Sequence, residues 1–311
     1  MSKYFSLFVR IWKLFKPFHK VFYIQLILIS TLAAMQVYEN VLLGKIVDTA
    51  SQKDFKNLII IFTIFVIFQI IYWTFDLIKD YRYVMDFSRK SIQHLRKYSL
   101  NEILKLNISQ FQENNSTIRF DIITRGEAGM VYIMENILLS MLPSSVLLIF
   151  AFITLSKFGL VLFSIAFIGA FVTFYIENKF QYKIKPEMRQ MSDRQQTQYK
   201  LSSEIFSHLS LIKQLSVENK FIKSYMKDRE SNMNLDLKTD GKKRKFQGKR
   251  NYIMAISNLF AVGYAIKLYI NGNLPLGSIF VIFAISNQVL GAAKGLQIYW
   301  GRFSYNSIDA I

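Results

Sequence analysis

Residues 58–75 read LIIIFTIFVIFQIIYWTF, a stretch without any charged side chain. A helix of about twenty apolar residues is long enough to cross the ~30 Å hydrocarbon core of a bilayer. Five further stretches have the same apolar character: Val21–Tyr38, Ile137–Leu155, Phe158–Ile176, Tyr252–Ile270 and Leu274–Ala293. The sequence therefore predicts an all-α membrane protein with six transmembrane helices.

The links between these spans alternate between short and long, and the two long segments follow the second and the fourth span. Residues 76–106 contain neither proline nor glycine, so about thirty residues at 1.5 Å each extend the second helix roughly 45 Å beyond the bilayer. The second long segment repeats this plan, with a helix irregularity expected at Gly241 and Gly248. The sequence thus predicts two long helical hairpins, and the helices with these extensions cover residues 21–47, 58–106, 118–155, 158–203, 219–270 and 274–308.

Residues 1–17 are predicted to form a separate elbow helix. Their aromatic residues recur at spacings of three and four, with basic residues between them: Phe5, Phe8, Trp12 and Phe15. An aromatic face beside a basic face favours a helix that lies in the membrane interface. The alternative is a disordered basic tail. Pro17 ends the elbow helix, and residues 18–311 form one six-helix domain.

The chain carries a formal net charge of +18. In a soluble protein this charge would indicate nucleic-acid binding, but cytoplasmic loops of membrane proteins also collect Lys and Arg. These residues are concentrated in the N-terminus and the two long segments, whereas Asn271–Asn273 carry no charge. We therefore expect a multi-pass protein of the plasma or inner membrane with both termini and both hairpins in the cytoplasm. Membrane lipid, and no nucleic acid, is the expected partner of its basic residues.

The sequence offers no constellation of residues for catalysis or metal binding. It has no cysteine, and its three histidines are far apart at His19, His94 and His208. It shows neither paired carboxylates nor a nucleophile beside a base. We expect this chain to catalyse no reaction and to bind no metal.

Five short motifs follow one another along the chain: KP at 16–17, LLGKIVD at 42–48, ILKL at 103–106 followed by QFQENN at 110–115, LIKQL at 211–215, and NLPLGS at 273–278. In this order and spacing they resemble the transmembrane domain of exporter-type ABC transporters, which has the type I exporter fold. The resemblance covers the whole chain. It departs from the family at Ile118, where glycine is usual, and at Gly291-Ala292-Ala293, where a Gly-Pro pair is common.

The resemblance implies that the two hairpin tips are coupling helices, which transmit the motion of an ATP-binding domain to the membrane. The residues assigned to this role are Gln110, Phe111, Gln112 and Glu113 on the first tip, and Ile212 and Lys213 on the second. The alternative for each tip is an ordinary turn between helices. The resemblance also implies two partners, which are an ATP-binding domain and a second transporter half in a homodimer or heterodimer.

Polar side chains inside membrane spans usually face a cavity or another helix. In an exporter some of them would line the translocation path, and the candidates are Gln36, Glu39, Asn287, Gln288 and Lys294. Lys294 could instead snorkel to an interface. For Gln25, Gln69 and Asn258, interhelical hydrogen bonds are the favoured interpretation. A cavity lined by aromatic and polar residues suits a hydrophobic or amphipathic substrate.

A phosphate-binding loop of the form Gly-x4-Gly-Lys-Ser/Thr is absent from the sequence. The three Gly-Lys pairs are followed by Ile46, Lys243 and Arg250. ATP and Mg²⁺ are therefore expected on an ATP-binding domain, either fused beyond Ile311 or on a separate polypeptide. An end just past the sixth span favours fusion.

Two other classes of function compete with an exporter half. A membrane sensor that relays a signal through its cytoplasmic helices would need a sizeable outer ligand-binding loop, and the outer links are too short for one. A membrane-embedded enzyme would need a catalytic cluster. The favoured interpretation is the membrane-spanning half of an ATP-driven exporter, which forms the substrate path and transmits the motion of the ATPase.

Overall fold

The computed structural model describes residues 2–105 and 116–306, and every regular element in these ranges is a helix. The longer helices are α2 (His19–Ser51), α3 (Phe55–Arg82), α6 (Ser116–Asn136), α8 (Leu160–Ser207), α10 (Glu218–Ile270) and α11 (Leu276–Asn306). The shorter ones are α1 (Ser2–Leu14), α4 (Arg89–Leu104), α7 (Leu142–Lys157) and α9 (Leu209–Gln214). Six helical stretches are long and apolar enough to cross a membrane, which confirms the predicted all-α class.

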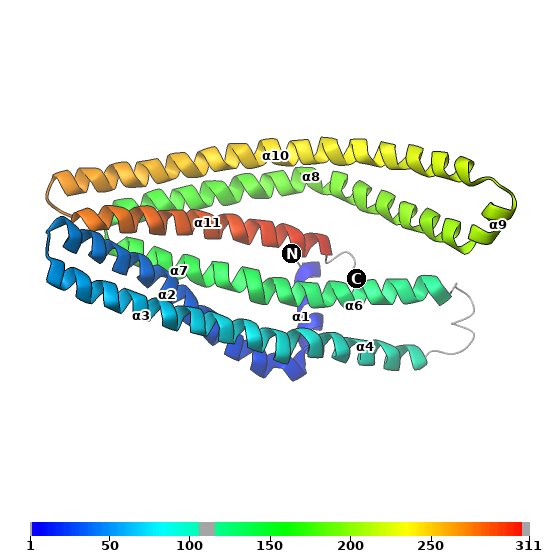
Figure 1. Ribbon diagram of the computed structural model, residues 1–311, viewed down its shortest axis with the longest axis horizontal. Coiled ribbons are helices and arrows are strands. Elements are labelled where there is room, and N and C mark those ends of the chain that lie inside the picture. The colour runs from blue at the N-terminus through cyan, green and yellow to red at the C-terminus, as the bar shows by residue number, and fades with distance from the viewer. Residues whose placement is uncertain (1, 106–115, 307–311) are drawn as a thin grey trace. The chain divides into compact units, whose positions relative to one another are not determined.

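The chain divides into two compact units, Met1–Phe174 with Ile256–Ile311 and Tyr175–Ala255. In the first unit, α2, α3, α7 and α11 pack beside one another (Figure 1). One core cluster of this unit is rich in small side chains, including Ala151, Ala166, Ala170 and Ala293. Small residues let helix backbones approach closely, which is how helices associate where water supplies no hydrophobic driving force.

The elbow helix α1 packs against the first unit through its apolar side. Ile11 and Phe15 are fully buried, and a short 3-10 turn at Lys16–Phe18 follows them. The ring of Phe87 lies 5.9 Å from that of Phe15 and 5.8 Å from that of Phe18, measured between centroids. Phe15, on the apolar side of the elbow, therefore contacts protein, and the position of the elbow in the membrane interface stays a prediction.

Much of the surface of α3 is apolar and exposed. None of its residues is buried, and large side chains such as Ile59, Ile70 and Trp73 are more than half exposed. In water such a surface would aggregate, but lipid tails are as apolar as these side chains. The exposure of α3 is therefore the expected state of a helix that faces lipid.

Two π-helical turns interrupt the first hairpin, at Tyr83–Ser88 between α3 and α4 and at Ile137–Met141 between α6 and α7. The sequence predicts ordinary α-helix at both places. The second turn has a visible cause, because Pro143 lies two residues beyond its end. Proline has no N–H and clashes with the carbonyl four residues earlier, and a wider turn accommodates that clash.

The second unit is a hairpin in which α8 and α10 run side by side and α9 forms the tip (Figure 1). Arg250 and Glu177 form an ion pair at 2.8 Å, with both side chains 4% exposed. Beside it, the rings of Phe180 and Phe246 stack at 3.8 Å. Further along, Arg229 donates to Gln198 Oε1 at 3.1 Å. Polar and aromatic contacts thus hold the two helices together over several turns.

The irregularity predicted at Gly241 and Gly248 is wrong, because α10 is one continuous α-helix from Glu218 to Ile270. Each glycine costs about 1 kcal/mol relative to alanine inside a helix. Contacts near both glycines, from Lys242 to Glu187 and from Phe246 to Phe180, hold this part of α10 against α8. The local preference of glycine is outweighed by these contacts.

Candidate functional site

The tip of the second hairpin is a compact reversal of the chain around α9. Ser216 adopts a left-handed conformation with φ of 51°. Its N–H donates to the carbonyl of Lys213 at 3.1 Å, and that of Val217 donates to the carbonyl of Ile212 at 3.3 Å. Such bonds satisfy the last carbonyls of a helix and fix the exit direction of the chain. The tip is therefore held by its own backbone.

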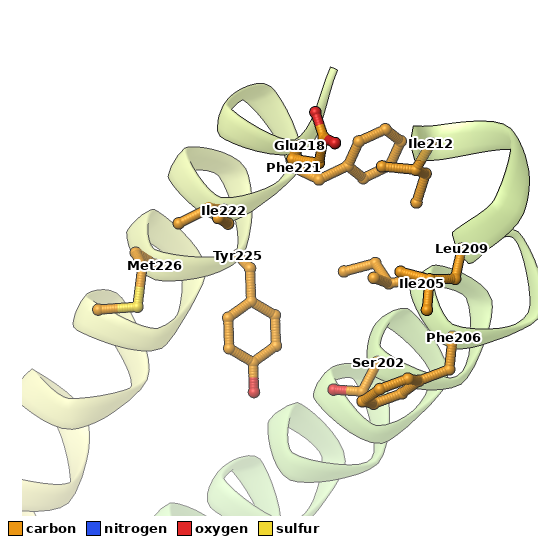
Figure 2. A pocket seen from close by; sticks show the side chains of 10 residues that line it. All are labelled: Ser202, Ile205, Phe206, Leu209, Ile212, Glu218, Phe221, Ile222, Tyr225 and Met226. Atoms are coloured by element: carbon orange, nitrogen blue, oxygen red, sulfur yellow. The ribbon is translucent and has the colours of Figure 1, made fainter. Parts of the chain in front are cut away.

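The side chains of α9 divide into an inner and an outer set. Ile212 is 5% exposed and lines a pocket of about 430 Å³ between α8 and α10. Figure 2 shows Ile212 next to Phe221 at one end of this pocket, with Tyr225 further in. On the outer side, Lys213 is exposed, and Leu211 and Leu215 are 52% and 61% exposed. These three residues therefore belong to the exposed outer surface of the tip, and Ile212 supports it from inside.

The first tip, with Gln110, Phe111, Gln112 and Glu113, lies outside the residues that the structure describes. The helix that leads to it, α4, ends with Glu102 and Lys105 in an ion pair at 2.6 Å. The hydrogen bond that Lys105 donates to the Glu102 carboxylate raises the pKa of Lys105 above its ordinary value. Lys105 is therefore protonated at neutral pH.

Three of the five path candidates form side-chain hydrogen bonds to another helix, and Gln36 takes part through its backbone carbonyl. Gln288 Nε2 donates to the backbone carbonyl of Gln36 at 3.3 Å, which joins α11 to α2. Glu39 Oε1 accepts from Gln69 Nε2 at 2.7 Å, which joins α2 to α3. Asn287 Oδ1 accepts from Asn258 Nδ2 at 2.9 Å. The structure thus places these polar groups at contacts between neighbouring helices.

Lys294 differs from the other candidates, because it has no carboxylate within ion-pair distance in the described part of the chain. Its side chain is half-buried on α11. A half-buried cation without a counter-charge inside a span is costly unless water or an anionic group reaches it. Lys294 remains a prediction as a path residue.

The interhelical hydrogen bonds predicted for three polar residues are confirmed. Gln25 Nε2 donates to the carbonyl of Lys79 at 3.0 Å, and Gln69 and Asn258 make the bonds to Glu39 and Asn287 given above. Such bonds contribute on the order of 0.6 kcal/mol each in membranes, so they orient helices more than they stabilise them.

Sequence reasoning missed Gln297, whose side chain is 1% exposed. Neither its Nε2 nor its Oε1 has a hydrogen-bond partner among the residues from 2–105 and 116–306. Lys294, one turn away from Gln297, stands out in the sequence because it is charged. The apolar span predicted from the sequence ends at Ala293. An amide four residues beyond that limit gave no signal, because a helix end near the membrane surface ordinarily carries polar residues.

The three Gly-Lys pairs do not form a phosphate-binding loop. A phosphate loop needs free backbone N–H groups that converge on the phosphates. The Gly-Lys pairs lie inside α2, for Gly44, and inside α10, for Gly241 and Gly248, where helical hydrogen bonds occupy the N–H groups. The described ranges also contain no group of three or more His, Cys, Asp or Glu that could hold a metal ion.

Comparison with known proteins agrees with this architecture. Residues 21–293 match the family model for the ABC transporter transmembrane region. The fold is similar to the structure of a bacterial Atm1-family ABC exporter with ATP bound, with a TM-score of 0.77 and 13% sequence identity. That match covers 94% of this chain and 52% of the other, so the chain spans about half the length of that exporter. No curated protein matches the sequence.

A family match over most of the chain and a shared fold over almost all of it lead to one assignment. The chain belongs to the ABC transporter transmembrane family and has the type I exporter fold.

Proposed function

We propose that this chain is the membrane-spanning half of an ATP-driven exporter, with both termini and both hairpins in the cytoplasm. The observation that carries the proposal is the family match over residues 21–293. The active transporter would contain a second membrane half and two ATP-binding domains, which supply ATP and Mg²⁺ binding. This chain would supply the substrate path and the mechanical link.

The substrate path would run along the polar residues of α2 and α11. Gln36 and Gln288 already join these two helices, and Glu39 and Asn287 lie within one turn of them. Lys294 would provide a cation further along α11. This combination of amides, one acid and one base among apolar side chains suits a hydrophobic or amphipathic substrate.

The mechanical link would use the outer side of the second tip. Leu211, Lys213 and Leu215 are exposed on that tip, and an apolar side chain that fills a groove on a partner anchors it well. Ile212 would act indirectly, because it is buried in its own hairpin. In the first tip, Phe111 with Gln110, Gln112 and Glu113 would fill the equivalent role. Long stiff helices then carry a rigid-body motion towards the membrane.

A sensor that relays a signal is the competing function, and the lengths of the links weigh against it. The links 52–54, 158–159 and 271–275 all belong to the first unit, and the first and last of these lie at the same end in Figure 1. Such short links leave no chain for an outer ligand-binding domain.

Photo-crosslinking from single cysteines tests the proposal, because the chain has no cysteine of its own. Leu211→Cys and Lys213→Cys would each carry a benzophenone, in membranes of cells that make the whole transporter. We expect both to crosslink to peptides of an ATP-binding domain, identified by mass spectrometry. Ile212→Cys is the matched control, since its side chain is buried, and it should crosslink far less. Crosslinks to a kinase, or none to an ATP-binding domain, would contradict the proposal.

A further inference from the structure

A basic pocket of about 440 Å³ lies between α8 and α10 in the second unit. Five of the residues that line it are lysines: Lys179, Lys183, Lys242, Lys245 and Lys249. Glu187 is the only acid among the described lining residues, and it pairs with Lys242. The other four lysines are exposed and have no carboxylate partner in the described ranges.

These four lysines form two facing pairs. Lys179 and Lys183 are one turn apart on α8, and Lys245 and Lys249 are one turn apart on α10. Residues four apart lie on the same face of a helix, and both pairs line the same pocket. The pocket therefore concentrates positive charge from two helices in one place.

The positions of the lysines are fixed by the packing beneath them. Phe180 and Phe246, which also line the pocket, stack at 3.8 Å with their rings 7° from parallel. One turn towards the apolar ends of the helices, the buried ion pair between Glu177 and Arg250 joins α8 to α10. The pocket thus has apolar side chains at its bottom and lysines around its opening, and the ion pair next to it holds α8 and α10 together.

The pocket lies at the depth where lipid phosphates are found. The apolar stretch of α8 ends at Ile176 and that of α10 begins at Tyr252. At 1.5 Å per residue, Lys179 and Lys249 lie about 5 Å beyond these ends, and Lys183 and Lys245 about 10 Å beyond them. The headgroup layer extends about 5–8 Å beyond the hydrocarbon core on each side. Lysine side chains at these positions reach that layer.

We propose that this pocket binds the phosphate of an anionic phospholipid in the leaflet that faces the two hairpins. Four clustered cations repel one another, and an anionic headgroup among them removes that repulsion. Basic pockets between membrane helices suit such headgroups. The lining residue Ile176 continues the apolar wall towards the bilayer, where the acyl chains lie. The inference requires only that the chain spans a membrane, and it does not depend on exporter activity.

Photo-crosslinking to lipid tests this site in the full chain. Gly248→Cys places a label beside Lys249 and one turn from Lys245, and a Cβ added there meets no atom within 4 Å. The benzophenone-labelled protein would be placed in vesicles of phosphatidylcholine with a minority of phosphatidylglycerol, and the captured lipids identified by mass spectrometry. We expect phosphatidylglycerol to be enriched about fivefold or more over its share of the bulk lipid.

Charge-removing variants then separate this site from general attraction to the membrane. The test variant is K179Q/K183Q/K245Q/K249Q, which should reduce capture to the bulk share. The control is K220Q/K223Q/K227Q/K238Q, which removes four exposed lysines of α10 that do not line the pocket and should retain the enrichment. If the test variant does not fold, the double variants K179Q/K249Q and K183Q/K245Q replace it, each with an expected partial loss.

Several results would overturn the proposal. Phosphatidylglycerol captured only at its bulk share by the labelled wild-type chain would do so without any variant. Equal losses of lipid capture in the test and control variants would show that capture depends only on the net charge of the chain. Displacement of the lipid by inorganic phosphate would indicate a site for a free anion, and crosslinks to a second copy of the chain in place of lipid would indicate a protein interface.

Discussion

The backbone N–H of Gly277 donates to Asp48 Oδ1 at 2.6 Å, which joins the start of α11 to the end of α2. The backbones meet here, because a Cβ on Gly277 would lie 1.9 Å from the carbonyl oxygen of Gly44. Two of the sequence motifs that resemble the family, at 42–48 and 273–278, are therefore the two sides of one contact between helices.

This contact predicts that Gly277→Ala destabilises the protein by about 1–3 kcal/mol, because the added methyl group forces α2 and α11 apart. The measurement is thermal unfolding in detergent. Gly291→Ala is the matched control on the same helix, since a Cβ there meets nothing within 4 Å. It should be neutral or stabilising by about 0.5–1 kcal/mol. Equal melting temperatures for the two variants would refute the close approach.

The buried ion pair of the second unit predicts a large effect from Glu177→Gln. The change leaves the Arg250 cation buried without its counter-charge, which should cost about 3–5 kcal/mol. Asp240 and Lys243 form a more exposed ion pair, in which the Asp240 side chain is 64% exposed and that of Lys243 is 31% exposed. Asp240→Asn removes the acid of this pair and should cost less than about 1 kcal/mol. Thermal unfolding of both variants checks the contrast, and a small loss for Glu177→Gln would show that the pair is hydrated.

The outer and inner sides of α9 predict different defects for neighbouring residues. Ile212→Ala should lower the thermal stability of the hairpin by about 2–4 kcal/mol, because it opens space beside the tip pocket. Leu211→Ala should leave stability within about 0.5 kcal/mol of wild type and lower the transport rate of the assembled transporter. Thermal unfolding and transport, each measured on both variants, show which residue supports the hairpin and which acts in coupling. Normal transport in Leu211→Ala would remove that residue from the coupling surface.

Lys294→Met separates three roles of this half-buried cation. If Lys294 lines the path, the variant should keep its melting temperature and change its transport rate or substrate preference. If Lys294 snorkels to an interface, both properties should stay as they are. A lower melting temperature would instead reveal a carboxylate partner, left unpaired by the change. Melting temperature and transport measured together identify the role.

The orientation predicted from the charge distribution is testable by labelling in intact cells. Single cysteines at Ser51 and Asn273 should react with a membrane-impermeant thiol reagent, because both positions are exposed at short links that carry little positive charge. Lys243→Cys should react only after the cells are permeabilised. Labelling of Lys243→Cys from outside would invert the topology.

The fold class followed from the sequence because six long apolar stretches leave few alternatives in a bilayer, where every backbone polar group must be satisfied within a helix. The π turns at Tyr83–Ser88 and Ile137–Met141 did not follow, although Pro143 lies near the second and both turns place a buried residue, Phe87 or Leu138, in one cluster. Periodicity over a few residues cannot distinguish such a turn from an α-helical one.

The sequence predicts which residues form the candidate site better than it predicts which way their side chains point. Gln36 and Gln288 are candidates because they are polar residues inside membrane spans. Only the structure shows that Gln288 donates a hydrogen bond to the backbone carbonyl of Gln36. Ile212 illustrates the limit more sharply, because the motif LIKQL does not say which of its apolar residues faces inwards. That depends on how α9 is held between α8 and α10, by the helix break at His208 and the chain reversal around Ser216.

The two π turns have a consequence for how mutations act on the first hairpin. A π turn holds one more residue than an α-helical turn, and one residue corresponds to about 100° of rotation around a helix axis. Deletion of a single residue within Tyr83–Ser88 would restore an α-helical turn and keep the helix intact. Everything beyond it would then present a different face to its neighbours, so the hairpin is sensitive to changes in the length of these turns.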